Sequence, residues 1–342
     1  MCIRDSFLEA RAHALQPLGE SSLYLPYATS LRMGRLGYQS DAQSTLAVSY
    51  NDLDGYGASL QEALTQPYPA YETVGVRNPG GDYNQLSTTL LQIENEFYGT
   101  IRPKRTVFSG ERPLHALRER GVQYVEVRCM DLDPFEPLGI SAATARFLDV
   151  FLLHCLLTDS PPDSPEEIEV LKRNQNLAAE RGREPGLLLR RGERETTLAQ
   201  WSAELIAECA VIAQRLDAET GTPLHTESLE NAAALAQDPS RLPSTRVLAA
   251  IRNEHDGSFM DFVRAQSLSL REAALAHPPT AEQVARFAEA STLSFEVQRE
   301  VEARDTMPFE IYRQQYLLPS RLGLRPRSAE PEFTQVAGAA AL

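Results

Sequence analysis

Two charged side chains of opposite sign stand close together in the segment Gln123–Phe135, QYVEVRCMDLDPF. Side chains alternate between the two faces of a β-strand, so Glu126 and Arg128 would share one face, with Cα atoms about 7 Å apart. Such a pair can be a surface ion pair on the solvated side of a sheet, which contributes little to stability. It can also be a reactive pair, in which the carboxylate binds a divalent cation and the guanidinium binds a phosphate. The segment alone favours the surface ion pair.

A second group of residues combines a cation, a hydroxyl and two glycines. Arg32 and Tyr38 are six residues apart, and Gly34 and Gly37 permit a tight turn between them. An arginine can bind a carboxylate through two parallel hydrogen bonds, and a tyrosine hydroxyl adds a further donor. Taken alone, Arg32 is a solvated side chain and Tyr38 a packing residue. The basic run Ile101–Arg105, IRPKR, is either a phosphate-binding loop or, by default, a solvated run.

Other motifs lack the arrangement that a catalytic site needs. The segment Glu254–Ser258, EHDGS, contains His, Asp and Ser, but a catalytic triad is assembled from distant segments, so we interpret it as a turn. The sequence contains neither a Walker A loop nor a GxGxxG motif. A nucleotide would therefore have to be held by side chains and metal ions on a sheet. We interpret His154 and Cys155 as core residues.

Composition limits the class of protein. The chain of 342 residues carries a formal net charge of -14, and an acidic chain lacks the clustered Lys and Arg that nucleic acids or anionic membrane surfaces require. Its four cysteines form no CxxC pair, which indicates a reducing compartment, the cytoplasm. The most apolar run, Phe147–Leu157, includes Asp149 and is too short to span a bilayer. We expect it to be a buried helix.

The order of the expected elements predicts an α+β protein. Between Leu23 and Phe135, strand patterns alternate with turn signals, and Ser44–Asp54 and the first part of Thr88–Arg105 are expected strands. Helix signals follow, with Ser164 and Thr280 as expected N-caps. The predicted helices cover residues 142–157, 198–219, 229–236, 244–252, 259–276 and 281–303, with one more beginning at 165.

This change from strand signals to helix signals, together with the composition of the C-terminal residues, divides the chain into three parts. We expect a strand-rich part of a catalytic domain over residues 1–140 and a helical region over residues 141–316. Residues 317–342 mix Pro, Gly and Ala without a period, which predicts a disordered tail.

Five segments together resemble one family, the glutamate–cysteine ligases (γ-glutamylcysteine synthetases) of the proteobacterial type. In chain order they are LYLPYATSLRMGRLGY (Leu23–Tyr38), LLQIENEFYGTIRPKR (Leu90–Arg105), YVEVRCMDLDPFEPLGI (Tyr124–Ile140), RFLDVFLLHCLL (Arg146–Leu157) and GREPGL (Gly182–Leu187). The resemblance runs from about residue 7 to residue 316. It implies part of an antiparallel sheet like that of glutamine synthetase, followed by a mainly helical region.

The resemblance also implies an activity and a set of site residues. Members of the family use ATP and Mg²⁺ to join the γ-carboxylate of L-glutamate to L-cysteine through a γ-glutamyl phosphate, the first step of glutathione biosynthesis. By the family pattern, Glu126 resembles a Mg²⁺ ligand, and Arg128 a catalytic clamp on the transferred phosphate of ATP. Arg32 resembles the residue that binds the cysteine carboxylate, with Tyr38 and Tyr98 beside it. Three more residues lie in or beside these motifs without an assigned role: Arg102, Lys104 and Cys129.

The sequence departs from the family pattern at its start. In the family, a substantial segment that carries most of the magnesium-binding carboxylates precedes the matched region, so we expect this chain to be a C-terminal portion with little activity alone. Two alternatives stay open: a carboxylate–amine ligase with another amine substrate, and a non-catalytic amino-acid-binding or regulatory relative.

Overall fold

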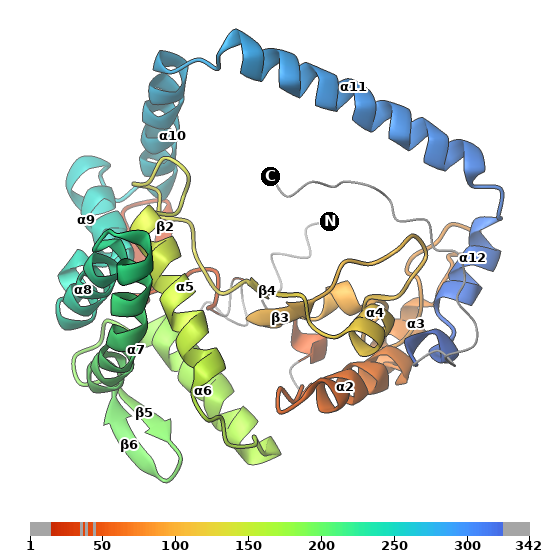
Figure 1. Ribbon diagram of the computed structural model, residues 1–342, viewed down its shortest axis with the longest axis horizontal. Coiled ribbons are helices and arrows are strands. Elements are labelled where there is room, and N and C mark those ends of the chain that lie inside the picture. Colours follow the sequence, from red (N-terminus) through yellow and green to blue (C-terminus); the bar gives the residue numbers. More distant parts are fainter. Residues whose placement is uncertain (1–14, 35–36, 38–39, 44–45, 324–342) are drawn as a thin grey trace. The chain divides into compact units, whose positions relative to one another are not determined.

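The protein forms two units, each built from separate stretches of the chain (Figure 1). The computed structural model describes residues 15–34, 37, 40–43 and 46–323. One unit comprises Met1–Asn51 and Val127–Leu268, and the other comprises Asp52–Glu126 and Ser269–Leu342. We call them the first and the second unit. The divisions expected from composition at residues 140 and 316 stay predictions.

Helices dominate the first unit. Helices α5 (Ala142–Leu157), α7 (Leu198–Thr220) and α8 (Leu224–Gln237) lie side by side (Figure 1). They enclose a core of Val150, Cys209, Ala213 and Leu229. Helix α6 (Pro165–Arg181) begins after Ser164, whose hydroxyl accepts a hydrogen bond from Glu167 N, so this predicted N-cap is confirmed.

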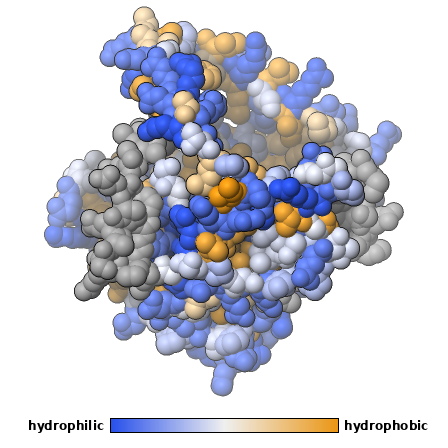
Figure 2. Space-filling model, turned by 90° about the vertical axis from the view of Figure 1, so that its right-hand side faces the viewer, coloured by the Kyte–Doolittle hydropathy of each residue, from blue (hydrophilic) through white to orange (hydrophobic). Residues whose placement is uncertain are grey.

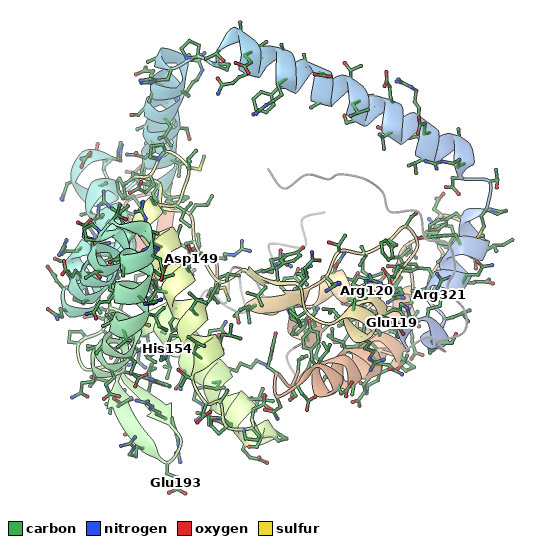
Figure 3. All side chains as sticks on the ribbon, in the orientation of Figure 1. Glu119, Arg120, Asp149, His154, Glu193 and Arg321 are labelled. Atoms are coloured by element: carbon green, nitrogen blue, oxygen red, sulfur yellow. The ribbon has the colours of Figure 1, made fainter. Side chains whose placement is uncertain are left out.

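The rest of the first unit consists of two short antiparallel sheets and further helices. Strand β5 (Leu188–Arg191) pairs with β6 (Arg194–Thr197), and Glu193 marks the tip of this hairpin (Figure 3). Strand β1 (Gln16–Leu18) pairs with β2 (Ser22–Tyr24). Helices α9 (Pro243–Glu254) and α10 (Phe259–Ala276) contribute Ala250, Ile251 and Phe262 to a second core, which includes Leu18. A one-turn 3-10 helix, Pro239–Arg241, precedes α9.

The second unit contains α2 (Leu53–Thr65), α3 (Pro69–Val74), α4 (Pro113–Arg120), α11 (Ala281–Arg304) and α12 (Phe309–Tyr316). Strand β3 (Ile101–Lys104) pairs with β4 (Tyr124–Val127). Leu60 of α2, Leu91 and Leu114 of α4 are buried in this unit. The predicted α+β class is confirmed, and the strands of the described residues occur as two-stranded sheets.

Helix α11 has no buried residue. Thr280 and Gln283 form its capping box, as the sequence predicted. Every one of its 24 residues is exposed, including Val284, Phe287 and Phe295. Exposed apolar side chains also occur on α12, and Figure 2 shows how apolar and polar side chains alternate over one face of the molecule.

Several expectations for the first 140 residues were wrong. Residues 46–51 contain no strand, and the expected strand after Thr88 is an irregular segment with a short 3-10 helix, Glu94–Glu96. Helix α2 was missed, although Asp52 caps it and its buried residues recur at helical spacing. Turn signals such as Gly55 and Gly57 lie inside α2, and they obscured that period.

Two further expectations need correction. Helix α5 has the predicted bounds and His154 is buried, but Cys155, Leu156 and Leu157 are exposed, so its last turn is not a buried helix. The predicted tail begins with ordered structure: Pro319–Leu322 forms a 3-10 helix, and Leu322 is 1% exposed. Arg118 donates a hydrogen bond to the carbonyl of Leu322, which anchors this segment to α4. Residues 324–342 lie outside the described part. Within the described residues, no helix has both the length and the apolar composition to cross a bilayer.

A carboxylate joins α7 to α8. Asp217 accepts hydrogen bonds from the backbone N–H groups of His225 and Thr226 at 2.8 and 2.9 Å, and its Oδ1 lies 2.8 Å from His225 Nδ1. These backbone N–H groups belong to the first turn of α8, which has no partner for them within the helix. Asp217 therefore caps α8 from the preceding helix.

The Asp217 cap makes stability depend on pH. Burial raises the pKa of the Asp217 carboxyl, but the hydrogen bonds from Thr226 and His225 outweigh this and hold the pKa well below its ordinary value. A lowered carboxyl pKa gives stability that is complete above the unfolded-state pKa of about 3.9 and is lost as pH falls below it. We expect the difference in Tm between the wild type and Asp217→Asn to shrink between pH 7 and pH 3, measured by thermal unfolding. Glu219→Gln, which removes an exposed carboxylate of the same helix, is the control. A difference in Tm that does not change with pH would contradict the capping role.

Candidate functional site

The charged residues singled out in the sequence fall into two groups, one in each unit. In the second unit, β3 and β4 bring Lys104 and Glu126 together, with Nζ 3.3 Å from Oε2. Gln123 N donates to the carbonyl of Lys104 at 2.8 Å, which fixes the pairing where β4 begins. The Glu126 side chain is 39% exposed, although its Oε2 atom is buried, and Tyr98 is 43% exposed. Lys104, for which the sequence gave no role, is thus an ion-pair partner of Glu126.

A buried cluster of charges supports this pair of strands. Arg102 of β3 is 4% exposed, and its Nη2 donates to the carbonyl of Asn95 at 3.1 Å. Burial raises the pKa of Tyr56 to about 12, while the nearby Arg102 lowers it and Glu94 raises it. Arg102 therefore lies inside the unit, and we interpret it as a structural residue and not as a phosphate ligand.

Glu94 and Arg112 form the centre of that cluster. Arg112 donates to the Glu94 carboxylate through Nε at 3.0 Å and Nη2 at 2.8 Å, and Leu114 N donates to Glu94 Oε1 at 3.3 Å. The third guanidinium nitrogen of Arg112, Nη1, donates to the carbonyl of Tyr316 at 2.8 Å, at the end of α12. A single ion pair thus joins the segment before β3 to the start of α4 and the end of α12. A second ion pair joins the end of α4 to the segment before it: Arg120 (Figure 3) donates to Glu111 at 2.8 Å.

In the first unit, Arg32 lies against the segment that follows β4. Its Nε donates to the carbonyl of Arg128 at 2.7 Å, and its backbone N donates to Asp131 Oδ1 at 2.9 Å. The other Asp131 oxygen accepts from the hydroxyl of Ser30. Ser30 Oγ in turn accepts from Met33 N at 2.9 Å. Two residues that are 96 positions apart, Arg32 and Arg128, are thereby held at one place.

The glycine turn after Arg32 matches the sequence argument. A Cβ on Gly37 would lie 2.0 Å from the carbonyl oxygen of Arg32, so no other residue fits there. Gly37 N also donates to the carbonyl of Gly34 at 3.0 Å. Tyr38 lies outside the described residues.

The prediction that Glu126 and Arg128 share one face of a strand was wrong. Strand β4 ends at Val127, so Arg128 is beyond the strand, and alternation relates only Tyr124 and Glu126. The chain passes from the second unit to the first between Glu126 and Val127. Sequence reasoning also missed Ser30 and Asp131. Asp131 stands in the same quoted segment as Arg128, but its partners are 99 and 101 residues away.

Cys129 is an exposed residue next to this group, but its sulfur is partly buried. Burial of its sulfur raises its pKa, while the nearby Arg32 opposes that effect. A raised pKa leaves little thiolate at neutral pH, and the thiolate is the reactive form. These observations favour an unreactive thiol over a nucleophile.

The described residues do not form a magnesium site by themselves. No group of three or more His, Cys, Asp or Glu side chains in the described ranges is arranged to hold a metal ion. Glu126 offers one carboxylate, and that carboxylate is paired with Lys104. Magnesium takes six oxygen ligands, so Glu126 could supply only one of them.

Comparison with known proteins identifies the family. The family model described as glutamate-cysteine ligase matches residues 1–178. The glutamate–cysteine ligase of Janthinobacterium sp. (strain Marseille) is 47% identical over 312 residues, which are 91% of this chain and 58% of the relative. That of Pseudomonas fluorescens (strain Pf0-1) is 44% identical over 306 residues, 90% of this chain and 57% of the relative.

A solved structure agrees with these relatives. The crystal structure of glutamate–cysteine ligase from Francisella tularensis in complex with AMP has a TM-score of 0.81 and 34% identity, and the match covers 90% of this chain and 60% of that one. The chain belongs to the glutamate–cysteine ligase family. It spans somewhat less than two thirds of the length of these relatives.

Proposed function

We propose that the chain forms part of an ATP-dependent ligase that joins the γ-carboxylate of L-glutamate to the amino group of L-cysteine. The relatives that match nine tenths of the chain are named for this reaction, and the Francisella relative is described in complex with AMP. An adenine nucleotide bound to that relative supports ATP as the co-substrate here. This ligation is the first step of glutathione biosynthesis, and the cytoplasm is its proposed compartment.

The proposed chemistry has two steps. An oxygen of the glutamate γ-carboxylate attacks the γ-phosphorus of ATP and displaces ADP. The amine of cysteine then attacks the acyl carbon of the γ-glutamyl phosphate and displaces inorganic phosphate. Both steps gather negative charge on phosphate oxygens, so a positioned guanidinium lowers their barriers. We assign that role to Arg128.

The same proposal gives roles to the remaining residues. Arg32 binds the cysteine carboxylate through its guanidinium, and Tyr38 and Tyr98 form the neighbouring walls of the cysteine pocket. Glu126 would supply one oxygen ligand to a magnesium ion. Such an ion would neutralise phosphate charge.

One hydrogen bond supports the roles assigned to Arg32 and Arg128. The Arg32 guanidinium donates to the backbone of Arg128 at 2.7 Å, which joins the proposed cysteine-binding residue to the proposed phosphate-binding residue. In the reaction, the cysteine amine must reach the carbon that carries the transferred phosphate. Residues that serve the two substrates must therefore lie next to each other, as Arg32 and Arg128 do.

The proposed function is tested with the protein encoded by the complete open reading frame that contains this chain. We expect ADP release that requires L-glutamate, L-cysteine and Mg²⁺ together, with γ-glutamylcysteine identified by mass spectrometry. Faster turnover with another amine, such as 2-aminobutyrate, would instead identify a ligase of different specificity. Cysteine binding without ADP release would identify a non-catalytic relative.

A further inference from the structure

The segment GREPGL (Gly182–Leu187) has no role in the reaction described above. Its Arg183 forms hydrogen bonds with the residues that precede Arg32. Arg183 donates to three consecutive carbonyl groups: its Nη2 to Pro26 at 2.7 Å, its backbone N to Tyr27 at 3.0 Å and its Nε to Ala28 at 2.9 Å. Its Nη1 donates to the hydroxyl of Thr245 at 3.2 Å. The backbone and the side chain of one arginine thus both bind residues 26–28.

The end of α6 holds the next two residues. Thr29 N donates to the carbonyl of Ala179 at 2.8 Å, and Thr29 Oγ1 donates to the carbonyl of Ala178 at 2.6 Å. Ser30 N donates to the same Ala179 carbonyl at 3.2 Å. The last carbonyls of a helix have no partner inside it, so residues 29–30 complete the hydrogen bonding of α6. A Cβ on Gly182 would lie 2.7 Å from Thr29 Cγ2, and only glycine allows this close approach.

Asp131 binds the later residues of the same segment. It accepts from the Ser30 hydroxyl and from Arg32 N, and the Ser30 hydroxyl accepts from Met33 N. Arg183 and the end of α6 therefore bind residues 26–30, and Asp131 binds Ser30 and Arg32. The Arg32 guanidinium extends from the end of this segment to the carbonyl of Arg128.

The chemistry of Arg183 suits the binding of backbone carbonyls. Burial lowers the pKa of its guanidinium, and the nearby positive charge of Arg252 lowers it further. The hydrogen bonds that the described structure gives the Arg183 guanidinium go to two carbonyls and one hydroxyl. The carbonyls at the end of α6 favour a cation there. The planar fork of arginine can reach the carbonyls of residues 26 and 28 at once, whereas a lysine is a point donor.

We infer that Asp131 and Arg183 are positioning residues for the cysteine-carboxylate site. Neither touches the substrate in this scheme. They act through Arg32, by fixing the backbone of the residues that lead to it. The inference rests on the proposed function, because it assumes that Arg32 binds the cysteine carboxylate.

The test uses Asp131→Asn and Arg183→Lys in the protein from the complete open reading frame. Asparagine keeps one acceptor but turns an amide donor toward Ser30 or Arg32 N, and lysine keeps the charge of Arg183 but loses the fork. A displaced binding group weakens the interaction it makes, so we expect the KM for L-cysteine to rise by about tenfold. The KM for L-glutamate and kcat should change by less than about twofold. Arg181→Gln is the matched control. Arg181 lies two residues from Arg183 and pairs with Glu184, so its substitution should leave the KM for L-cysteine unchanged.

A double substitution separates positioning from general stability. If Asp131 acts through Arg32, Asp131→Asn should raise the KM for L-cysteine no further in an Arg32→Ala protein. Additive effects on that KM, or a lowered Tm with an unchanged KM for L-cysteine, would overturn the inference. If the wild type makes γ-glutamylcysteine but neither single variant differs from it, only the positioning role fails. If the wild type makes none, the proposed function fails and the inference fails with it.

Discussion

The Arg128→Ala variant is expected to make γ-glutamylcysteine at a kcat about 10³-fold below that of the wild type, because a guanidinium on a transferred phosphoryl group contributes a factor of this order. The substitution removes the side chain alone. The carbonyl of Arg128, which accepts from Arg32 Nε at 2.7 Å, stays in place. The KM for L-cysteine should therefore change far less than kcat. Arg128→Lys keeps the charge but loses the bidentate geometry, so its kcat should lie between those of the wild type and Arg128→Ala.

Steady-state ADP release by the protein from the complete open reading frame measures this effect. Arg264→Ala is the matched control, since Arg264 is an exposed arginine on α10 and should leave kcat unchanged. A kcat for Arg128→Ala within tenfold of the wild type would show that Arg128 is not the phosphate clamp. A rise in the KM for L-cysteine with kcat unchanged would move Arg128 to the cysteine site.

The Glu94→Gln variant is expected to lose about 3–5 kcal/mol of unfolding free energy, because it leaves a buried guanidinium without its counter-ion. The Arg112 side chain is 1% exposed and the Glu94 side chain 5%. Glutamine is nearly isosteric with glutamate, so the change removes charge and hydrogen-bond acceptors without opening a cavity. Urea unfolding followed by circular dichroism measures the loss.

Two companion variants make this result specific. Glu300→Gln breaks an exposed pair with Arg304 on α11 and should cost less than about 0.5 kcal/mol. Glu94→Gln combined with Arg112→Met removes both charges and should recover part of the stability. If Glu94→Gln is no more destabilising than Glu300→Gln, the buried pair does not hold the second unit together.

The sequence predicted best the features that depend on neighbouring residues. Helices α5 and α10 have the predicted bounds, and the caps at Ser164 and Thr280 are confirmed. An N-cap and its partner lie three residues apart, so both are visible in one short segment. The signals for these helices therefore needed no knowledge of the rest of the fold.

Features that depend on distant residues were missed or misjudged. The alternating pattern around Glu94 suggested a strand face, but Glu94 turns inward to Arg112, 18 residues later. Asp131 bonds to Ser30 across 101 residues, and Arg183 to Ala28 across 155 residues. No local pattern can show such partners. The roles proposed for Arg32, Tyr38, Tyr98, Glu126 and Arg128 came from the resemblance to the family and stay predictions.

The exposure of α11 has a consequence for how the protein opens in solution. No core holds a side chain of Ala281–Arg304 within the described structure, so its amides are protected only by the helix itself. Most of the stability of a helix in a protein comes from tertiary packing of its apolar face, so α11 should fray from its ends. Native-state hydrogen exchange should therefore show α11 exchanging by local helix–coil fluctuation, with rates that respond little to dilute urea. The amides of α5, α7 and α8 should exchange far more slowly, through cooperative opening of the core around Val150 and Cys209.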